Sequence, residues 1–249
     1  MTVAGSPEDA AAVRAAERNR AFYDPLWATA DLIEPDRFNS WPLVQSMVSP
    51  GTRCLEVACG LRPRLPLDGT HFVDVSAPAL AEFARRGLSA TRASLTALPF
   101  PTECFDVVCA LDVVEHLSDG ERALDELVRV MAIGAVLLLS VPLHAERWTN
   151  FDDAVGHCRR YEPVELAAVI EGLGLRVERS AAYGMQPRES WLLDLGLKYL
   201  SRHPRRAMWW YNHAFMPIGL RLQKPLRMVD GFIATQGVDE VLLVCRRLR

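Results

Sequence analysis

The sequence has 249 residues, of which half are apolar, and it carries 28 lysines and arginines against 31 aspartates and glutamates. This composition is typical of a globular protein with a buried core, and it excludes collagen-like, low-complexity and mostly disordered chains. No run of about 18 uncharged apolar residues is present, and the first residues lack a basic stretch followed by an apolar one. We therefore expect neither a membrane span nor a secretory signal, and a cytoplasmic location.

The net charge of −3 is unevenly distributed along the chain. Residues 1–184 carry 17 basic and 26 acidic side chains, whereas residues 185–249 carry 11 and 5. A basic C-terminal part suits an anionic substrate or a peripheral membrane contact, and no other feature indicates a nucleic-acid partner. The six cysteines include no Cys-x-x-Cys pair, so we expect reduced core thiols and no metal site.

The N-terminal part predicts helices. Ser6-Pro7-Glu8-Asp9 combines a helix N-cap with a proline at the first helical position, and the Ala-rich sequence that follows extends the helix to about Phe22. A second apolar stretch over residues 41–48 ends at Ser49-Pro50-Gly51. We assign residues 1–50 to an N-terminal helical cap.

Residues 51–184 alternate short apolar runs with helical periods. The helical periods cover residues 77–86, 120–131 and 163–172, and the runs predicted as strands are 54–58, 70–75, 105–111, 135–141 and 175–182. Strands that are apolar on both faces and separated by helices predict an α/β fold, with a doubly wound, mostly parallel sheet covered on both sides. Residues 239–249 would add the last strand, at 240–245.

A long segment, residues 185–238, separates the last two predicted strands. It is rich in arginines and aromatic residues, among them Trp209, Trp210 and Tyr211. A connection of this length must carry structure of its own. We predict a helical insertion that forms a lid over the ligand-bearing edge of the sheet, in which the tryptophans either wall an apolar pocket or pack in the core.

The residues that follow the first two strands are candidates for ligand binding, because doubly wound sheets bind ligands at the carboxyl ends of their strands. The first strand leads into Ala58 and Gly60, small residues that let the backbone approach a ligand closely. The second strand leads into Asp74, whose carboxylate can accept both hydroxyls of a ribose. Ser76 is placed to cap the next helix.

The order of these motifs resembles that of the class I S-adenosylmethionine-dependent methyltransferases over roughly residues 53–180. The similar elements are the Glu-x-x-Cys-Gly turn at 56–60, Asp74 at the end of the second strand, Leu98-Pro99-Phe100 before the fourth strand, Asp112-Val113-Val114-Glu115-His116 after it, and the helix and strand around residues 129–142. The resemblance implies a seven-stranded Rossmann-like methyltransferase fold. It also implies S-adenosylmethionine as the cofactor.

The resemblance further implies which residues surround that cofactor. Residues 58–62 would lie near its methionine part, Asp74 at its ribose, Ser94 and Leu95 beside its adenine, and Asp112 near its amino group. Tyr23 either covers the cofactor or packs in the core. The complete implied set is Tyr23, Glu56, Ala58, Gly60, Arg62, Asp74, Val75, Ser94, Leu95, Leu111 and Asp112.

Three residues are candidates for the catalytic step: His116, His157 and Tyr161. His116 follows the fourth strand, where an imidazole could take up a proton from the nucleophile, or it could cap the loop before the next helix. His157 and Tyr161 follow the fifth strand. They would orient the nucleophile, or they belong to a polar hinge before residue 163.

We expect methyl transfer to an O-, N- or C-nucleophile of a small, partly apolar molecule, by a monomer or homodimer. Ala58 replaces a glycine that the family commonly has, and only 14 positions separate Gly60 from Asp74. These departures leave a cofactor-binding, non-catalytic homologue as one alternative. The basic, aromatic C-terminal part leaves a membrane-peripheral lipid or quinone methyltransferase as another.

Overall fold

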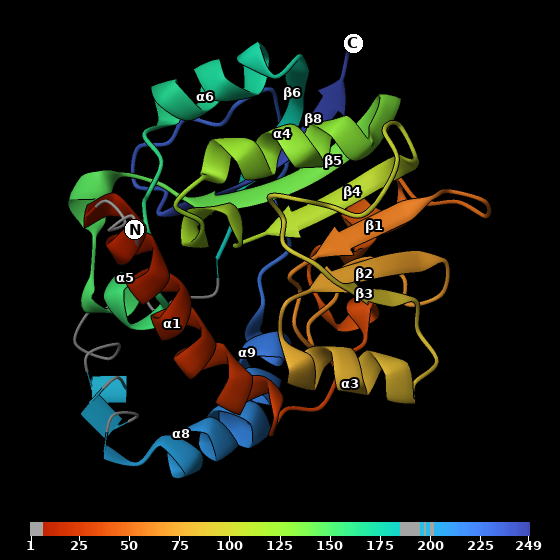
Figure 1. The fold of residues 1–249 in the computed structure, drawn as a ribbon. Coiled ribbons are helices and arrows are strands. Elements are labelled where there is room, and N and C mark those ends of the chain that lie inside the picture. The colour runs from red at the N-terminus through yellow and green to blue at the C-terminus, as the bar shows by residue number, and fades with distance from the viewer. Residues whose placement is uncertain (1–6, 185–194, 197, 200–201) are drawn as a thin grey trace, which may run out of the picture.

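The computed structural model describes residues 7–184, 195–196, 198–199 and 202–249, and one mixed sheet forms its centre (Figure 1). The strand order is β3-β2-β1-β4-β5-β8-β6-β7. The strands are β1 (Cys54–Val57), β2 (Thr70–Asp74), β3 (Ala90–Arg92), β4 (Phe105–Leu111), β5 (Met131–Pro142), β6 (Leu175–Ala182), β7 (Val229–Asp230) and β8 (Glu240–Arg247). The winding reverses between β1 and β4, which defines the edge where a ligand is expected.

The strand pairing confirms the doubly wound, mostly parallel sheet. β1 pairs in parallel with both β2 and β4, so that Glu56 lies opposite Phe72 on one side and Cys109 on the other. β8 inserts antiparallel between β5 and β6. The expected number of seven strands is wrong, because the two-residue β7 pairs with β6 and gives eight strands in the described part of the chain.

The helices agree with the capping signals. They are α1 (Pro7–Trp27), α2 (Trp41–Gln45), α3 (Ala77–Arg85), α4 (Gly120–Val130), α5 (Asn150–Val155), α6 (Pro163–Gly172), α8 (Pro204–Trp210) and α9 (Met216–Leu222), with a π-helical turn at Tyr211–Phe215 and 3-10 turns at Pro35–Arg37, Val114–His116 and Ala145–Arg147. The end predicted for the first helix is wrong, since α1 continues past Phe22 and includes Pro25. Ser6, its predicted cap, lies outside the described residues.

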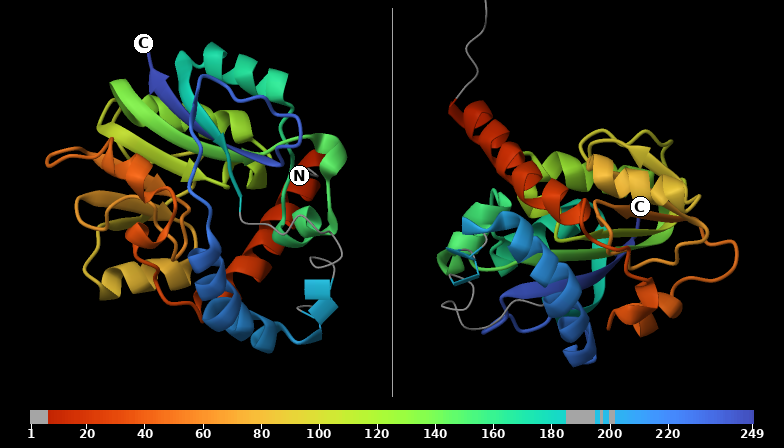
Figure 2. Two further views of the ribbon diagram at one scale, coloured as in Figure 1. Left: turned by 180° about the vertical axis from the view of Figure 1, so that it is seen from behind. Right: turned by 90° about the horizontal axis from the view of Figure 1, so that it is seen from below.

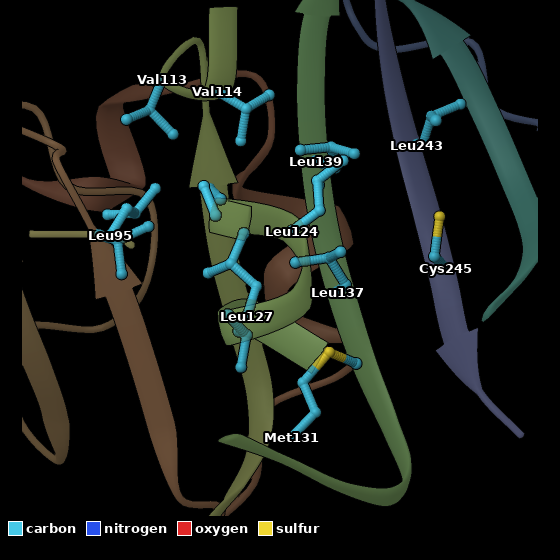
Figure 3. Packing of buried hydrophobic residues seen from close by; sticks show 14 of the residues in the cluster. Leu95, Val113, Val114, Leu124, Leu127, Met131, Leu137, Leu139, Leu243 and Cys245 are labelled. Atoms are coloured by element: carbon cyan, nitrogen blue, oxygen red, sulfur yellow. The ribbon is translucent and has the colours of Figure 1, made fainter. Parts of the chain in front are cut away.

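Apolar side chains alternate between the two faces of the sheet. On one face, α4 and α6 pack against Leu137, Leu139 and Leu243, a layer that Figure 3 shows from close by. On the other face, Val44 of α2 and Leu65 pack against the intervening strand residues. All six cysteines are free, as expected, and three of them are buried in these layers.

A third apolar cluster anchors α1 to the sheet. Leu26 and Trp27 of α1 pack there with Phe72, Phe83 and Met208. Figures 1 and 2 show α1 crossing the edge formed by the carboxyl ends of the strands, with α8 beside its C-terminal half. The N-terminal helix therefore covers the ligand-bearing edge.

The helical insertion predicted for residues 185–238 is described only in part. Residues 185–194, among them Trp191, lie outside the described residues. Residues 204–222 form α8, the π-helical turn and α9 without a break. Among the described helices, none combines the length and the apolar character that crossing a bilayer would require.

Candidate functional site

A cavity of about 330 Å³ lies beneath α1 at the carboxyl ends of β1, β2 and β4. This volume falls at the lower end of the usual range for ligand pockets, about 300–1,000 Å³. Of the predicted cofactor residues only Gly60 does not line it; the others are Tyr23, Glu56, Ala58, Arg62, Asp74, Val75, Ser94, Leu95, Leu111 and Asp112. A larger hollow near Asp106 and Arg246 contains none of the predicted site residues.

Glu56 forms the buried floor of the loop after β1. Its carboxylate accepts hydrogen bonds from the backbone N–H groups of Arg64, at 2.8 Å, and Leu65, at 2.9 Å. Burial raises the pKa of Glu56 to about 7, although these hydrogen bonds oppose the rise. Glu56 therefore holds the short loop between β1 and β2 against the sheet.

Gly60 lies behind the cavity wall because α1 packs directly on it. Its φ is +55°, and a Cβ built there would lie 2.2 Å from the Trp27 ring. Its N–H donates to Asp74 Oδ2 at 3.0 Å. Ala58, which does line the cavity, has φ +52°, a left-handed conformation that costs an L-residue roughly 1–2 kcal/mol.

Asp74 is buried, and both of its carboxylate oxygens are oriented by backbone groups. Oδ2 accepts the Gly60 N–H, and Oδ1 accepts the Ser76 N–H at 2.8 Å. Each carboxylate oxygen retains a lone pair for a further donor. Ser76 occupies the N-cap position of α3, as predicted, but its side chain makes no capping hydrogen bond, because its hydroxyl donates to Asp24 Oδ1 at 2.9 Å.

Arg62 presents unpaired donors at the cavity wall. Its guanidinium lies over the rings of Trp27 and Tyr211, at 4.9 and 5.0 Å, and Nη1 donates to the Tyr211 hydroxyl at 3.1 Å. Its buried Nε and Nη2 have no partner among the described residues. Arg64 is already engaged, since its Nε donates to the Tyr183 hydroxyl at 3.3 Å. Arg62 therefore has free hydrogen-bonding capacity for an anionic group.

One face of α1 completes the wall. Asn19, Tyr23 and Trp27 recur every four residues and all line the cavity. The Tyr23 and Trp27 rings stack with centroids 5.9 Å apart, and Tyr23 meets His116 edge-on at 5.7 Å. Our sequence analysis named Tyr23 but missed Asn19 and Trp27. The four-residue spacing was the signal that could have found them, but the predicted helix ended at about Phe22, before Tyr23 and Trp27.

Asp112 reverses the chain after β4. Its φ is +52°, and its N–H donates to the Ser140 hydroxyl at 3.0 Å, while that hydroxyl donates to Asp112 Oδ1 at 2.5 Å. On the opposite side of the cavity, Leu95 is buried and Ser94 pairs with Thr96 through their hydroxyls. The predicted adenine and amino-group residues therefore lie on different walls of the same cavity.

His116 lines the cavity, and His157 lies behind it. The two rings are 4.6 Å apart between centroids. Asn19 Nδ2 lies 3.0 Å from His116 Nδ1, and Asp152 Oδ1 lies 2.8 Å from His157 Nδ1. Burial, with a smaller contribution from His157, lowers the pKa of His116 to about 3. The His116 imidazole is therefore neutral at physiological pH.

Tyr161 does not join the two histidines at the cavity. Its backbone forms an isolated bridge with Leu143, and a Cβ built on Gly120 of α4 would lie 3.0 Å from its hydroxyl. Burial raises the pKa of Tyr161 to about 12. The side chain therefore packs against the start of α4, outside the residues that line the cavity.

Comparison with known proteins now adds to this geometry. Residues 55–139 match the family model of a methyltransferase domain. The probable tRNA methyltransferase 9B of Homo sapiens is 31% identical over 135 residues, 50% of this chain and 30% of that protein. A probable S-adenosylmethionine-dependent methyltransferase of Mycolicibacterium smegmatis is 33% identical over 87 residues, 34% of each protein. Residues 55–139 therefore form a methyltransferase domain similar to those of S-adenosylmethionine-dependent methyltransferases.

The methyltransferase domain also has solved structural relatives. An S-adenosylmethionine-dependent methyltransferase from Thermotoga maritima, described as a possible histamine N-methyltransferase, gives a TM-score of 0.57 at 15% identity. The match covers 94% of this chain and 95% of that one, and at this identity it shows the fold alone. The chain spans about a third of the length of the curated relatives that it matches.

The cofactor of this methyltransferase family is S-adenosylmethionine, and the cavity has groups that fit it. The unpaired donors of Arg62 suit its carboxylate. The buried, oriented carboxylate of Asp74 suits vicinal ribose hydroxyls. These two features are independent of the family match, and both residues line one cavity.

Proposed function

We propose that this chain transfers a methyl group from S-adenosylmethionine to a nucleophile of a small, partly apolar molecule. One observation carries the proposal: the free donors of Arg62 and the oriented carboxylate of Asp74 line one cavity that α1 covers. When bound, the cofactor supplies a methyl group on a positively charged sulfur, which a nucleophile displaces. The protein has to position the nucleophile and exclude water.

The chain's own residues divide these tasks between them. Arg62 binds the carboxylate, and Asp74 accepts the ribose hydroxyls. Leu95 packs against the adenine, and the backbone at Asp112 faces the amino group. The stacked Tyr23, together with Trp27, excludes water from the covered side of the cavity.

His116 is the residue that we assign to the acceptor. It lines the cavity and is neutral at physiological pH, so it can form a hydrogen bond with the acceptor and orient it. A small acceptor is favoured because α1 lies over the edge of the sheet and its aromatic side chains line the covered wall. His157, behind His116, is a positioning residue in this proposal, and we assign no role to Tyr161.

Calorimetric titration with S-adenosylmethionine and S-adenosylhomocysteine tests the cofactor site. We expect Arg62→Ala and Asp74→Ala each to weaken binding roughly 10–100-fold, because each loses charge-assisted hydrogen bonds worth about 1.5–3 kcal/mol. Arg85→Ala is the matched control, since Arg85 pairs on the surface with Glu82. Absence of binding to the unaltered protein at millimolar cofactor would reject the proposal.

Methyl transfer from radiolabelled cofactor tests the substrate class. We expect label in small, organic-extractable molecules and none in tRNA. Label in tRNA alone would overturn the substrate class and leave the cofactor site intact. Tight cofactor binding without transfer to any acceptor would instead support the non-catalytic homologue.

A membrane-peripheral methyltransferase is the second candidate, because apolar side chains are exposed along α8 and α9. Trp209 and Trp210 are each about half exposed, and Phe215 and Leu222 are exposed to 65% and 74%. Such a surface suits an interface with lipid, and the adjacent arginines suit anionic headgroups. Flotation with anionic vesicles at low salt separates this candidate from a freely diffusing enzyme.

A further inference from the structure

A cluster of three ligand-type side chains lies behind the cavity wall. One ring nitrogen of His116, one of His157 and one carboxylate oxygen of Glu115 all lie within 4.8 Å of one another. Glu115 and His116 follow β4, and His157 follows α5. The cluster borders the cofactor cavity through His116. The proposed function assigns no role to Glu115.

The environment of His157 fixes which of its nitrogens is free. Asp152 Oδ1 accepts from Nδ1 at 2.8 Å, and Arg160 donates to both Asp152 oxygens at 2.9 Å. Thr149 donates to the same carboxylate through its N–H at 2.7 Å. With Nδ1 engaged by this carboxylate, Nε2 is the nitrogen that remains for another partner. Histidines that bind metal ions are oriented by the same carboxylate–histidine contact.

The free nitrogen of His157 faces a second electron-rich group. Nε2 lies 3.9 Å from Glu115 Oε1. Glu115 is 1% exposed, and its Oε2 has no hydrogen-bond partner among the described residues. A buried carboxylate with an unused oxygen costs free energy unless a donor or a cation satisfies it. A cation between the two groups would supply a partner for this oxygen.

We propose that Glu115, His116 and His157 form a binding site for a divalent transition-metal cation such as Zn²⁺. Two imidazoles and one carboxylate are a ligand set that this ion accepts, with ligand distances of about 2.0–2.2 Å. Three protein ligands leave an open coordination position for a further ligand.

The position of this site suggests its use, which rests on the proposed function. Because His116 lines the cofactor cavity, the cation lies at the wall where the methyl acceptor enters. A cation there binds an oxygen or nitrogen atom of the acceptor and stabilises its deprotonated form. The sequence analysis expected no metal site because it searched for cysteine spacing, whereas these ligands come from two separate loops.

A second cluster, of one histidine and two glutamates, provides the control. His144, Glu146 and Glu162 also lie within 4.8 Å of one another, but the Glu146 side chain is 66% exposed. His144 Nε2 lies 3.1 Å from the Thr235 carbonyl oxygen, and Glu162 Oε1 accepts the Ala145 N–H. Its polar groups are already satisfied, so we expect no tight site there.

Titration with Co²⁺ after chelator treatment tests the proposal, with the visible absorption of the bound ion as the readout. We expect one ion per chain and loss of at least tenfold in affinity for Glu115→Gln and His157→Asn. Asp152→Asn should weaken binding about 10–100-fold through the orientation of His157. His144→Ala should bind as the unaltered protein does. Far-UV circular dichroism checks that each variant is folded.

Two results would overturn the proposal: no saturable Co²⁺ spectrum, or binding that His144→Ala removes and folded His157→Asn retains. Calorimetry with S-adenosylmethionine separates this outcome from failure of the proposed function. Glu115→Gln should leave cofactor affinity unchanged, since Glu115 does not line the cavity. A chain that binds Co²⁺ but not the cofactor keeps the metal site and loses the methyltransferase assignment.

Discussion

The cavity has two walls that are built in different ways. The strand-end wall consists of the turns after β1, β2 and β4, and backbone hydrogen bonds and left-handed φ values at Ala58, Gly60 and Asp112 hold it. The helical wall consists of α1, which α8 contacts on its other side. Side-chain contacts hold it, such as the Tyr23–Trp27 stack and the Arg62–Tyr211 hydrogen bond.

This difference separates cofactor binding from acceptor choice. A turn set by backbone geometry tolerates few substitutions, because each change alters the path of the chain. A wall set by side chains can be repacked without moving the sheet. We therefore expect cofactor binding to depend on the strand-end wall, and acceptor selectivity to depend on the helical wall.

Gly60, where the two walls meet, gives the largest predicted effect on stability. An alanine there would place its Cβ 2.2 Å from the Trp27 ring, and it would also have to adopt φ +55°. We expect Gly60→Ala to lower the free energy of unfolding by about 2–4 kcal/mol and to abolish cofactor binding. Urea unfolding and calorimetry measure the two effects.

Gly69 is the control for backbone strain alone. Its φ is +81°, but a Cβ there would meet nothing within 4 Å. Gly69→Ala should therefore cost roughly 1–2 kcal/mol and leave cofactor affinity unchanged. If Gly60→Ala and Gly69→Ala lower the free energy of unfolding equally, the packing of α1 is not the reason that a glycine is needed at position 60.

The strand-end wall could be predicted from the sequence because its residues follow strands with a clear pattern. The apolar runs at 105–111 and 175–182 predicted the bounds that β4 and β6 have in the structure. Parallel strands bring their carboxyl ends to one edge, so Asp74 and Asp112 had to meet there. The short β3 had no such pattern, since its three residues are not fully buried.

The remaining features depend on side-chain packing between distant segments, which a single sequence does not reveal. Gly60 was expected to face the ligand, but Trp27 covers it. Tyr161 was expected near the nucleophile, but it packs against the start of α4. The contact of His157 with Glu115 likewise depends on how the loop after α5 returns to the sheet.

Glu56 tests the strand-end wall through pH. Burial raises its pKa from an ordinary 4.5 to about 7, so the folded state holds this proton more tightly than the unfolded state. Its contribution to stability is present below pH 4.5 and is lost as the pH rises to about 7. Glu56→Gln should remove this loss, which we place at roughly 2–3 kcal/mol. Urea unfolding at pH 5 and pH 8 measures it.

Glu82 is the control for Glu56, because its contribution to stability changes with pH in the opposite direction. Hydrogen bonds from Arg85, despite a small opposing effect of burial, lower the pKa of Glu82 to about 2. Its contribution is therefore present above pH 4.5 and is lost as the pH falls towards 2, and it is small because the pair lies at the surface. If the free energy of unfolding of Glu56→Gln still falls by this amount from pH 5 to pH 8, Glu56 is not the group that causes the loss.

Substitutions on the exposed side of residues 204–222 should have the smallest effect on stability and the clearest effect on vesicle binding. Trp209 and Phe215 are exposed to 51% and 65%. Replacing both by serine should change the free energy of unfolding by no more than about 0.5 kcal/mol, as is usual for exposed positions. Cofactor affinity should stay unchanged, because neither residue lines the cavity.

If α8 and α9 contact lipid, flotation with anionic vesicles should fall severalfold. Equal flotation of the variant and the unaltered protein would exclude a lipid role for this surface, and a drop in cofactor affinity would show that the two walls are not independent.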